Sequence, residues 1–427
     1  MKQFIVFLFL SVNLFSNAQN HELIGYWQNW NDSNAPFIPL NQIDPRYTII
    51  CVSFAVPTSP SNMTMVFTPD GVSQSEFISQ VQGLQNQGKK ILLSIGGATA
   101  SISLSDDATK ITFINSMNAI LDAYPFDGID IDIEHGNSIL ATGTIANPTS
   151  SDCINLIDAI SQIKAHYFSL YNKNMILTMA PETAYVQGGM SAYGGIWGGY
   201  LPILDALRND INFIHVQLYN SGSVYGIDGN IYTQGTPDFI VAMSEALIHG
   251  FSTAGGFFTG FPAHKVVVGL PSCPNAAGGG FVSTLQVQNA VKYLLGTGPQ
   301  AGSYVLNQPA GYNDLGGLMT WSINWDKVTT CNSTPYEYAE NFQQLFDSSL
   351  DNTNSIHREM KLYPVPSSYE LFISNLMQTE NYQITNCRGQ IIQQNSLNPN
   401  STILITNLNN GLYILKIANQ NFKFVKF

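Results

Sequence analysis

The chain has 427 residues, of which only 11% are charged, and its formal net charge is −12. Nucleic acids and anionic membranes bind through basic surfaces, so an acidic chain is expected to bind neither, nor a phosphorylated substrate. Few charges and many Asn, Ser, Thr and Gly residues suit a neutral ligand rich in hydroxyl groups. The length accommodates one large enzyme domain and a second, small one.

The N-terminus has the features of an export signal. Lys2 is followed by the apolar run from Phe4 to Leu10 and by Ser16-Asn-Ala18, whose small residues are typical of a signal-peptide cleavage site. The pattern predicts a signal peptide at residues 1–18. The apolar run is too short to span a bilayer, and no later segment has the roughly twenty uninterrupted apolar residues of a transmembrane helix. We therefore expect a soluble protein that is secreted or held at the cell surface.

Residues 22–350 alternate between short apolar runs and longer amphipathic segments, an order typical of repeated βα units around a parallel sheet. The eight apolar runs are 23–30, 47–56, 90–97, 128–134, 175–181, 213–220, 265–271 and 317–325, and the helix-like segments are 73–87, 105–124, 150–171, 237–249, 284–295 and 335–348. Eight strands with crossovers predict an α/β fold, a closed (β/α)8 TIM barrel. A doubly wound open sheet is the alternative, but no GxGxxG loop follows the first run.

The segment between the seventh and eighth runs is short. Only about 45 residues separate Pro271 from Gly317, and a helix occupies part of them. We therefore expect no large inserted α+β subdomain at this point.

Five cysteines without a CxxC pair indicate neither a zinc site nor a disulfide-rich scaffold, and we expect no metal or other cofactor. Cys273 and Cys331 follow the last two apolar runs. They could bridge neighbouring loops in an oxidising compartment.

The fourth run carries the acidic sequence Asp127-Gly-Ile-Asp-Ile-Asp-Ile-Glu134. Asp130, Asp132 and Glu134 share one parity, so a strand places them on one face, about 6.6 Å apart in succession, with the isoleucines on the other. Mutual repulsion then raises at least one pKa or forces a proton to be shared. An isolated strand of this kind is usually a solvated edge. Within a barrel, helices cover the outer face, so the acids point inward and Glu134 lies at the catalytic rim.

Four motifs on successive strands carry a family resemblance. They are Asp127 to Glu134, Ser94-Ile-Gly96-Gly97, Gln217-Leu-Tyr219-Asn220 and Met319-Thr-Trp321. Their types and order resemble the DGxDxDxE signature and the accompanying motifs of glycoside hydrolase family 18, the chitinases, over most of residues 22–348. Asn220 departs from the Asp of many members, which puts the pH optimum in question more than the activity.

The resemblance implies substrate-assisted catalysis, in which the 2-acetamido oxygen of the sugar attacks the anomeric carbon. Glu134 is then the acid that protonates the leaving oxygen and later activates water. Asp132 holds the acetamido N–H, Asp130 shares a proton with Asp132, and Tyr219 donates its hydroxyl to the acetamido oxygen. Trp321 is the floor under the sugar. Without the resemblance, the two aromatic residues would be ordinary barrel filling.

Further residues receive weaker roles. Substrate-binding candidates are Tyr26, Ser94, Gly96, Gly97, Gln217, Met179 and Asn220, and Asp127 is a structural candidate. Tyr26 could hydrogen-bond Asp130 or simply pack, and Ser94 could satisfy a backbone group. Aromatic residues that could extend the sugar groove are Trp30, Trp197, Tyr225 and Trp325. His135 points away from Glu134 by parity and is structural at most.

The C-terminal part differs in character. After a polar linker at 351–358, residues 359–427 contain short alternating strands, which predict a small all-β, immunoglobulin-like sandwich. Leu362-Tyr-Pro-Val-Pro and the terminal Phe424-Val-Lys-Phe427 resemble the type A sorting domain of type IX secretion, which implies export through that machinery. A carbohydrate-binding or fibronectin-like module is the alternative, but the segment lacks Trp, the usual sugar-stacking residue.

Together these patterns predict a secreted, monomeric chitinase that cleaves β-1,4 bonds between N-acetylglucosamine units with retention. Tunnel-forming members of that family resemble this chain except for an α+β subdomain inserted before the eighth strand, so the resemblance implies an open groove here and mainly endo-type cleavage of chitin or chitooligosaccharides. Two alternatives share the fold. One is an endo-β-N-acetylglucosaminidase acting on glycoprotein glycans, and the other is a sugar-binding barrel lectin, which would generally have lost Glu134.

Overall fold

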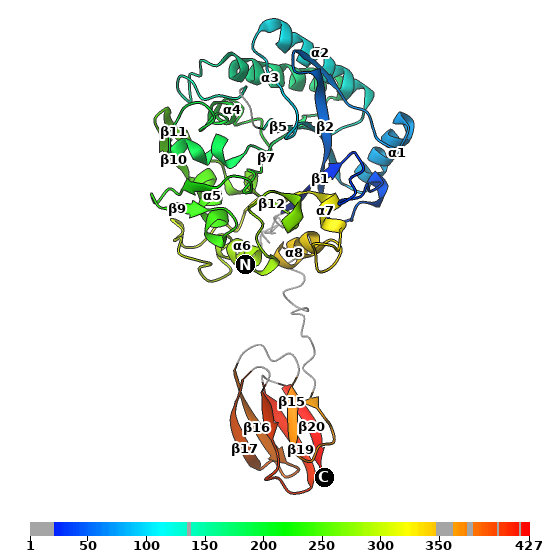
Figure 1. The fold of residues 1–427 in the computed structure, drawn as a ribbon, viewed down its shortest axis with the longest axis vertical. Helices are drawn as coiled ribbons and strands as arrows, with labels where there is room; N and C mark the ends of the chain where they lie inside the picture. The colour runs from blue at the N-terminus through cyan, green and yellow to red at the C-terminus, as the bar shows by residue number, and fades with distance from the viewer. Residues whose placement is uncertain (1–20, 135–137, 347–361, 374–378, 399–400, 418–419) are drawn as a thin grey trace, which may run out of the picture. The chain divides into compact units, whose positions relative to one another are not determined.

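The computed structural model describes residues 21–134, 138–346, 362–373, 379–398, 401–417 and 420–427. The expected signal peptide, the expected linker and His135 lie outside these residues. The chain divides into two compact units, with the division between Phe346 and Asp347, and each unit is described by itself (Figure 1).

The first unit is a barrel of eight parallel strands. Its order is β12-β13-β1-β2-β4-β5-β6-β7, and two parallel bridges, Ile214 to Val266 and Gln217 to Gly269, connect the ends of this order. The strands are β1 (Glu22–Gln28), β2 (Ile49–Ser59), β4 (Lys90–Gly96), β5 (Gly128–Asp132), β6 (Ile176–Met179), β7 (Phe213–Ile214), β12 (Val267–Pro271) and β13 (Gly317–Trp321). The predicted TIM barrel is thereby confirmed.

Helices surround the strands as an outer layer (Figure 1). They are α1 (Gln74–Gln85), α2 (Asp107–Ala123), α3 (Ser151–Tyr171), α4 (Leu201–Ala206), α5 (Pro237–His249), α6 (Thr284–Leu294), α7 (Ile323–Lys327) and α8 (Glu337–Phe346). Side-chain caps explain several starts. The hydroxyls of Ser73, Ser150 and Thr236 each accept an N–H of the following turn, and Asp106 forms a reciprocal capping box with Thr109.

The sixth and eighth strands are shorter than the sequence suggests. The run 213–220 forms a strand only at Phe213–Ile214, and the run 317–325 stops at Trp321. The Ser322 hydroxyl accepts the N–H of Trp325 and caps α7, so the chain turns helical within the predicted strand.

Small antiparallel additions decorate the barrel. They are β3 (Asn62–Val66), which pairs with β2, the hairpin of β8 (Ser223–Tyr225) and β9 (Ile231–Thr233), and the hairpin of β10 (Gly250–Thr253) and β11 (Gly256–Thr259). One-turn 3-10 helices are η1 (Leu40–Gln42), η2 (Thr183–Tyr185), η3 (Gln187–Met190), η4 (Ala263–Lys265) and η5 (Pro274–Ala276). Between β12 and β13, all of whose residues are described, only η5 and α6 occur, so the expected lack of a large inserted subdomain is confirmed.

Two apolar layers flank the barrel strands. A large core lies between strands and helices and includes Ile129, Ile131 and Ile133, while a smaller cluster inside the barrel includes Tyr26 and Met319. Because successive strand residues alternate sides, Asp130 and Asp132 share the interior parity of the smaller cluster. The parity prediction for this strand therefore holds.

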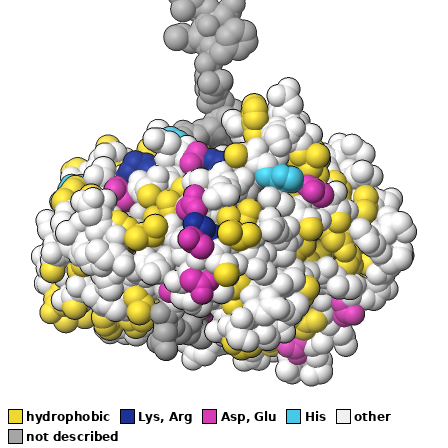
Figure 2. Space-filling model, turned by 90° about the horizontal axis from the view of Figure 1, so that it is seen from above, with side chains coloured by type: hydrophobic (Ala, Val, Ile, Leu, Met, Phe, Trp, Pro, Cys, Tyr) yellow, Lys and Arg dark blue, Asp and Glu magenta, His cyan; other side chains and the backbone are white. Residues whose placement is uncertain are grey.

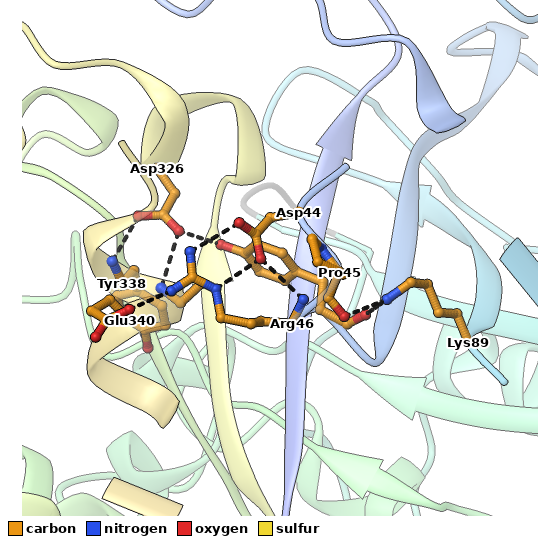
Figure 3. Close-up of polar contacts among 9 residues, drawn as sticks. Asp44, Pro45, Arg46, Lys89, Asp326, Tyr338 and Glu340 are labelled. Carbon is orange, nitrogen blue, oxygen red and sulfur yellow. Dashed lines mark hydrogen bonds and ion pairs between the residues drawn. The ribbon is translucent and has the colours of Figure 1, made fainter. Parts of the chain in front are cut away.

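A polar network, buried at Asp326 and exposed at Glu340, joins α7 and α8 to the segment that leads into β2 (Figure 3). Asp326 accepts the Tyr47 hydroxyl at 2.6 Å and the backbone N–H of Tyr338 at 2.7 Å. Arg46 reaches Glu340 on α8 at 2.6 Å. The network fixes α7 and the first turn of α8 against the barrel.

Cys273 and Cys331 form a disulfide, which confirms the expected bridge between these two loops. Trp325 packs against Cys273 and Ala35 and is only 8% exposed. The expectation that Trp325 extends the sugar groove is therefore wrong, because α7 turns this side chain into the small core around the disulfide.

The surface carries few charges, as the composition predicts. Figure 2 shows a face on which polar and hydrophobic side chains surround a small number of charged ones. Among the described helices, none combines the length and the apolar character needed to cross a bilayer.

The second unit is all-β, as predicted. Its two antiparallel sheets contain β14 (Leu362–Tyr363), β15 (Glu370–Ile373) and β18 (Thr402–Leu404) in one, and β16 (Glu380–Asn386), β17 (Ile391–Leu397), β19 (Gly411–Ile417) and β20 (Gln420–Lys426) in the other. Leu371, Ile384, Leu415 and Phe424 belong to one apolar cluster that includes residues from both sheets. This cluster is a core separate from that of the barrel.

Candidate active site

The three predicted acids lie along and just beyond β5. Asp130 is fully buried within the barrel and Asp132 is 2% exposed, whereas Glu134 lies two residues past the end of the strand and is partly exposed. In parallel α/β barrels the C-terminal ends of the strands meet at one rim, where substrate-binding loops begin. The acids therefore form a column that rises from the interior to the rim.

Asp130, at the bottom of the column, accepts hydrogen bonds from hydroxyl groups on three other barrel strands, β1, β4 and β6. Its Oδ2 accepts from Tyr26 at 2.6 Å and from Ser94 at 2.7 Å, and its Oδ1 accepts from Thr178 at 2.6 Å. Burial alone would raise the pKa of this carboxyl, but the His215 charge and these hydrogen bonds outweigh it and lower the pKa. Asp130 therefore stays ionised at a lower pH than an ordinary aspartate does.

Asp132 and Glu134 share one donor. The side-chain amide of Gln217 lies 2.9 Å from Oδ1 of Asp132 and 3.1 Å from Oε1 of Glu134. Burial raises the pKa of Asp132 well above its usual range, and the negative charges of Glu134 and Asp130 raise it further. Asp132 also forms a side-chain hydrogen bond with Glu134. A proton held by Asp132 is therefore in direct contact with the carboxyl at the rim.

Two glycines allow this close arrangement. Gly96 has φ of +114°, and a Cβ there would lie 2.3 Å from the carbonyl oxygen of Asp132. Gly97 has φ of +79°, and a Cβ there would lie 2.6 Å from the ring of Phe54. A side chain at either position would push the acid strand or the aromatic wall away. Their contribution is space rather than a direct contact with a ligand.

Aromatic rings gather beside the acids. Trp321, at the end of β13, is partly exposed and stacks on Phe54 with centroids 5.9 Å apart and planes 12° apart. Trp30 stacks on Phe54 with centroids 6.1 Å apart, and its ring also lies 6.3 Å from that of Trp321. Such faces suit the apolar side of a sugar ring. Phe54 was not among the sequence candidates, because a single Phe within an apolar run carries no distinguishing signal.

Tyr219 and Asn220 lie beyond β7. Tyr219 is 5% exposed, and burial raises its pKa well above the usual value, so its hydroxyl keeps its proton and can donate it. Asn220 is exposed and adopts a left-handed backbone with φ of +54°, a conformation that Asn tolerates better than most residues.

Met179 was expected among the substrate-binding residues, and that expectation is wrong. It is fully buried in the layer between strands and helices. In the register of β5 and β6, Met179 pairs with Ile131 and Thr178 pairs with Asp130. Thr178 therefore faces the interior, and the alternation of the run 175–181 contained the signal for it.

Other candidates take different positions. Tyr26 and Ser94 are buried and hydrogen-bond Asp130, so they support the acid rather than line an open groove. Trp197 and Tyr225 are each 40% exposed. Asp127 precedes β5 and accepts the N–H of Ile91 at 3.0 Å, as a structural residue would. The sequence also offered no reason to select His215, whose immediate neighbours Phe213, Ile214 and Val216 are apolar.

Family models and known proteins resemble this chain in both units. The model of glycosyl hydrolases family 18 matches residues 22–363, and the model of a secretion system C-terminal sorting domain matches residues 361–427. Chitinase D of Niallia circulans is 45% identical over 313 residues, which cover 72% of this chain and 59% of that protein. Chitinase ChiA of Flavobacterium johnsoniae is 33% identical over 344 residues, which cover 76% of this chain and 22% of that protein.

Among solved structures, a family 18 chitinase from Chromobacterium violaceum superposes with a TM-score of 0.68 at 36% identity, covering 77% of this chain and 84% of that one. The chain spans about three fifths of the length of Chitinase D and 22% of the length of Chitinase ChiA. The family match extends over the whole barrel and all four sequence motifs. The chain therefore belongs to glycosyl hydrolase family 18 and ends in a secretion system C-terminal sorting domain.

Proposed function

We propose that this chain is a secreted chitinase that hydrolyses β-1,4 bonds between N-acetylglucosamine units with retention of configuration. The observation that carries this proposal is the contact between Asp132 and Glu134, which share the amide of Gln217. Retaining enzymes with a carboxylate nucleophile separate their two carboxyls by about 5–5.5 Å, with the sugar between them. Two acids that hydrogen-bond each other leave no such space, so a group of the substrate serves as nucleophile.

Each acid has one task in this mechanism. Glu134, at the rim, protonates the leaving glycosidic oxygen and later takes a proton from water. Asp132 accepts the acetamido N–H and offsets the positive charge of the cyclic intermediate, while the protonated hydroxyl of Tyr219 donates to the acetamido oxygen. The acetamido oxygen attacks the anomeric carbon as the glycosidic bond breaks. Water then attacks the same carbon from the face that the leaving group left, which opens the cyclic intermediate and retains the configuration.

The groove is proposed to be open and the cleavage endo-type. Trp321 forms the floor beneath the sugar at the cleaved bond, and Trp30 extends the aromatic surface. The segment between β12 and β13 carries only η5 and α6, so no inserted subdomain closes over this floor. A long polymer can therefore enter at internal positions along its length.

Substrate choice is tested by incubating the purified chain with colloidal chitin and, separately, with a high-mannose glycoprotein. The proposal predicts soluble chitooligosaccharides from chitin and no glycan release from the glycoprotein. The reverse result would identify an endo-β-N-acetylglucosaminidase instead. With end-labelled oligomers, internal cuts are expected, and release of disaccharide from one end alone would contradict the endo mode.

The tail is proposed to guide export through the type IX machinery, after a signal peptide at 1–18 and a linker at 351–358. The match of a secretion system sorting domain to residues 361–427 supports this role, and the four-stranded sheet with its own core supports an independently folded unit. Deleting residues 359–427 should leave the enzyme in the periplasm of a host with this machinery. Unchanged extracellular activity would contradict the assignment.

A further inference from the structure

His215 lies against Asp130 and has no part in the roles described so far. It is fully buried, and its Nε2 lies 3.3 Å from Oδ1 of Asp130. Neither ring nitrogen has a hydrogen-bond partner within the described ranges, and the ring stands edge-on to Tyr26, 6.0 Å between centroids. A buried polar ring without hydrogen bonds is costly unless another interaction compensates. The contact with Asp130 has the distance of an ion pair.

The other ionisable groups around His215 are acids or are held neutral. Asp130 faces it from β5, Tyr26 from β1 and Cys51 from β2. Burial raises the pKa of Tyr26 and of Cys51 well above their usual values, so both keep their protons at ordinary pH. The neighbouring strand β6 contributes the neutral hydroxyl of Thr178, which donates to Asp130. His215 is therefore the group that can place a positive charge against the column of acids.

A metal ion is a poorer explanation of the same cluster. Ligand atoms of Cys51, Asp130 and His215 all lie within 4.8 Å of one another. Both oxygens of Asp130, however, already accept hydroxyl hydrogen bonds of 2.6–2.7 Å, and the Cys51 thiol keeps its proton, whereas a metal needs a thiolate. The donor set fits an ion pair.

We propose that His215 is a positioning residue whose imidazolium pairs with the Asp130 carboxylate and thereby directs the proton of the acid column to the Asp132–Glu134 pair. The proposal rests on the function proposed above and changes one step of it. Asp130 no longer shares a proton with Asp132, as the family resemblance implies. Asp132 instead points its proton at Glu134 before any substrate is present.

The directions of the two pKa shifts agree with this assignment. Burial opposes ionisation of Asp130, yet the charge on His215 and the donated hydrogen bonds lower its pKa, whereas the pKa of Asp132 is raised. When an acetamido N–H donates a hydrogen bond to an oxygen of Asp132, one proton moves from Asp132 to Glu134. Asp132 then carries the negative charge that faces the intermediate, and Glu134 is the protonated acid.

The charge on His215 is measured directly by ¹⁵N NMR of the full chain labelled at its seven histidines. The His215 signal is assigned as the one lost in the variant His215→Gln, or in His215→Asn should the first not fold. The proposal predicts that both ring nitrogens carry protons at neutral pH. A neutral imidazole at the pH of maximal activity would overturn it.

The consequence for catalysis is measured as the pH profile of kcat/KM. Removing a positive charge beside the acids raises their pKa values, so both limbs of the profile of His215→Gln should shift to higher pH by about one unit. Cys51→Ala is the matched control, because it removes a buried neutral side chain whose thiol lies within 4.8 Å of His215 and Asp130, without changing charge. Its limbs should stay in place.

If His215 were merely structural, His215→Gln would lower stability or kcat, and the limbs of both variants would stay at the pH values of the wild type. That result would contradict the proposal. Failure of the proposed function is distinguishable from this outcome. If the chain cleaves no chitin, the NMR measurement still reports the charge on His215 without turnover. If chitin is cleaved and His215 is neutral, only the positioning role fails.

Discussion

The side-chain amide of Gln217 lies 2.9 Å from Oδ1 of Asp132. This contact joins the segment that follows β7 to the end of β5. The same nitrogen is 3.1 Å from Oε1 of Glu134. One neutral donor thus holds two acids that would otherwise repel each other, and it sets their orientation toward a ligand. Gln217 was expected to bind substrate, whereas its side-chain amide donates to the two acids and to the carbonyl oxygen of Ala180.

Replacing Gln217 with Met keeps the volume and removes the donor. The pKa of Asp132, already raised, should rise further, and Glu134 should lose its fixed orientation. We expect kcat/KM to fall by about 10- to 100-fold, which corresponds to about 1.4–2.7 kcal/mol of transition-state stabilisation. Gln187→Met is the control, since it removes a buried amide that donates to Met243 outside the site. Equal activity in both variants would argue against the shared-donor role.

Asp326 should impose a pH dependence on stability. Burial raises its pKa to about 6, so the folded state binds this proton more tightly than the unfolded state does. The stabilising contribution is complete below about pH 4 and is lost as the pH rises through 6, a change of about 3 kcal/mol.

Urea unfolding followed by Trp fluorescence at pH 4 and pH 7 measures this contribution, because all five Trp residues lie before residue 347. The unfolding free energy of the wild type should fall between these pH values by about 3 kcal/mol more than that of Asp326→Asn. Because each protein is compared with itself at the two pH values, the pH-independent loss of hydrogen bonds in the variant cancels from the difference in unfolding free energy. Parallel changes in both proteins would show that Asp326 does not titrate in this range.

The disulfide should stabilise the barrel without taking part in catalysis. It closes a loop of 58 residues, for which chain entropy predicts about 4 kcal/mol of stabilisation. The double variant Cys273→Ser and Cys331→Ser should unfold at lower temperature, with kcat/KM at 25 °C nearly unchanged. Reducing agent should lower the unfolding temperature of the wild type and leave the variant as it is. A loss of activity at 25 °C would instead connect the bridge to the shape of the groove.

The sequence predicted the barrel well because its signals are local and periodic. Alternation in the run 127–134 was sufficient to place Asp130 inside and Ile131 outside. The predictions failed where tertiary context decides. Trp325 looked like a strand residue at the groove, but the cap at Ser322 starts a helix and buries it.

Contacts across strands were the least predictable part of the site. Thr178 could have been found, because its parity within the run 175–181 puts it beside Asp130. His215 and Phe54 could not, because a single polar or aromatic residue in an apolar strand is usually packing. Their contacts with Asp130 and Trp321 depend on how neighbouring strands are staggered, which the pattern of one strand does not encode.

The central claim, that Glu134 is the proton donor of a chitin-cleaving site, is tested most directly by Glu134→Gln. The variant keeps the size of the side chain and removes its exchangeable acid proton. We expect kcat on a chitooligosaccharide to fall by about 10³-fold or more, while the Kd of the same oligosaccharide, measured by calorimetry, stays within a few-fold of the wild type. An unchanged rate with intact binding would contradict the account.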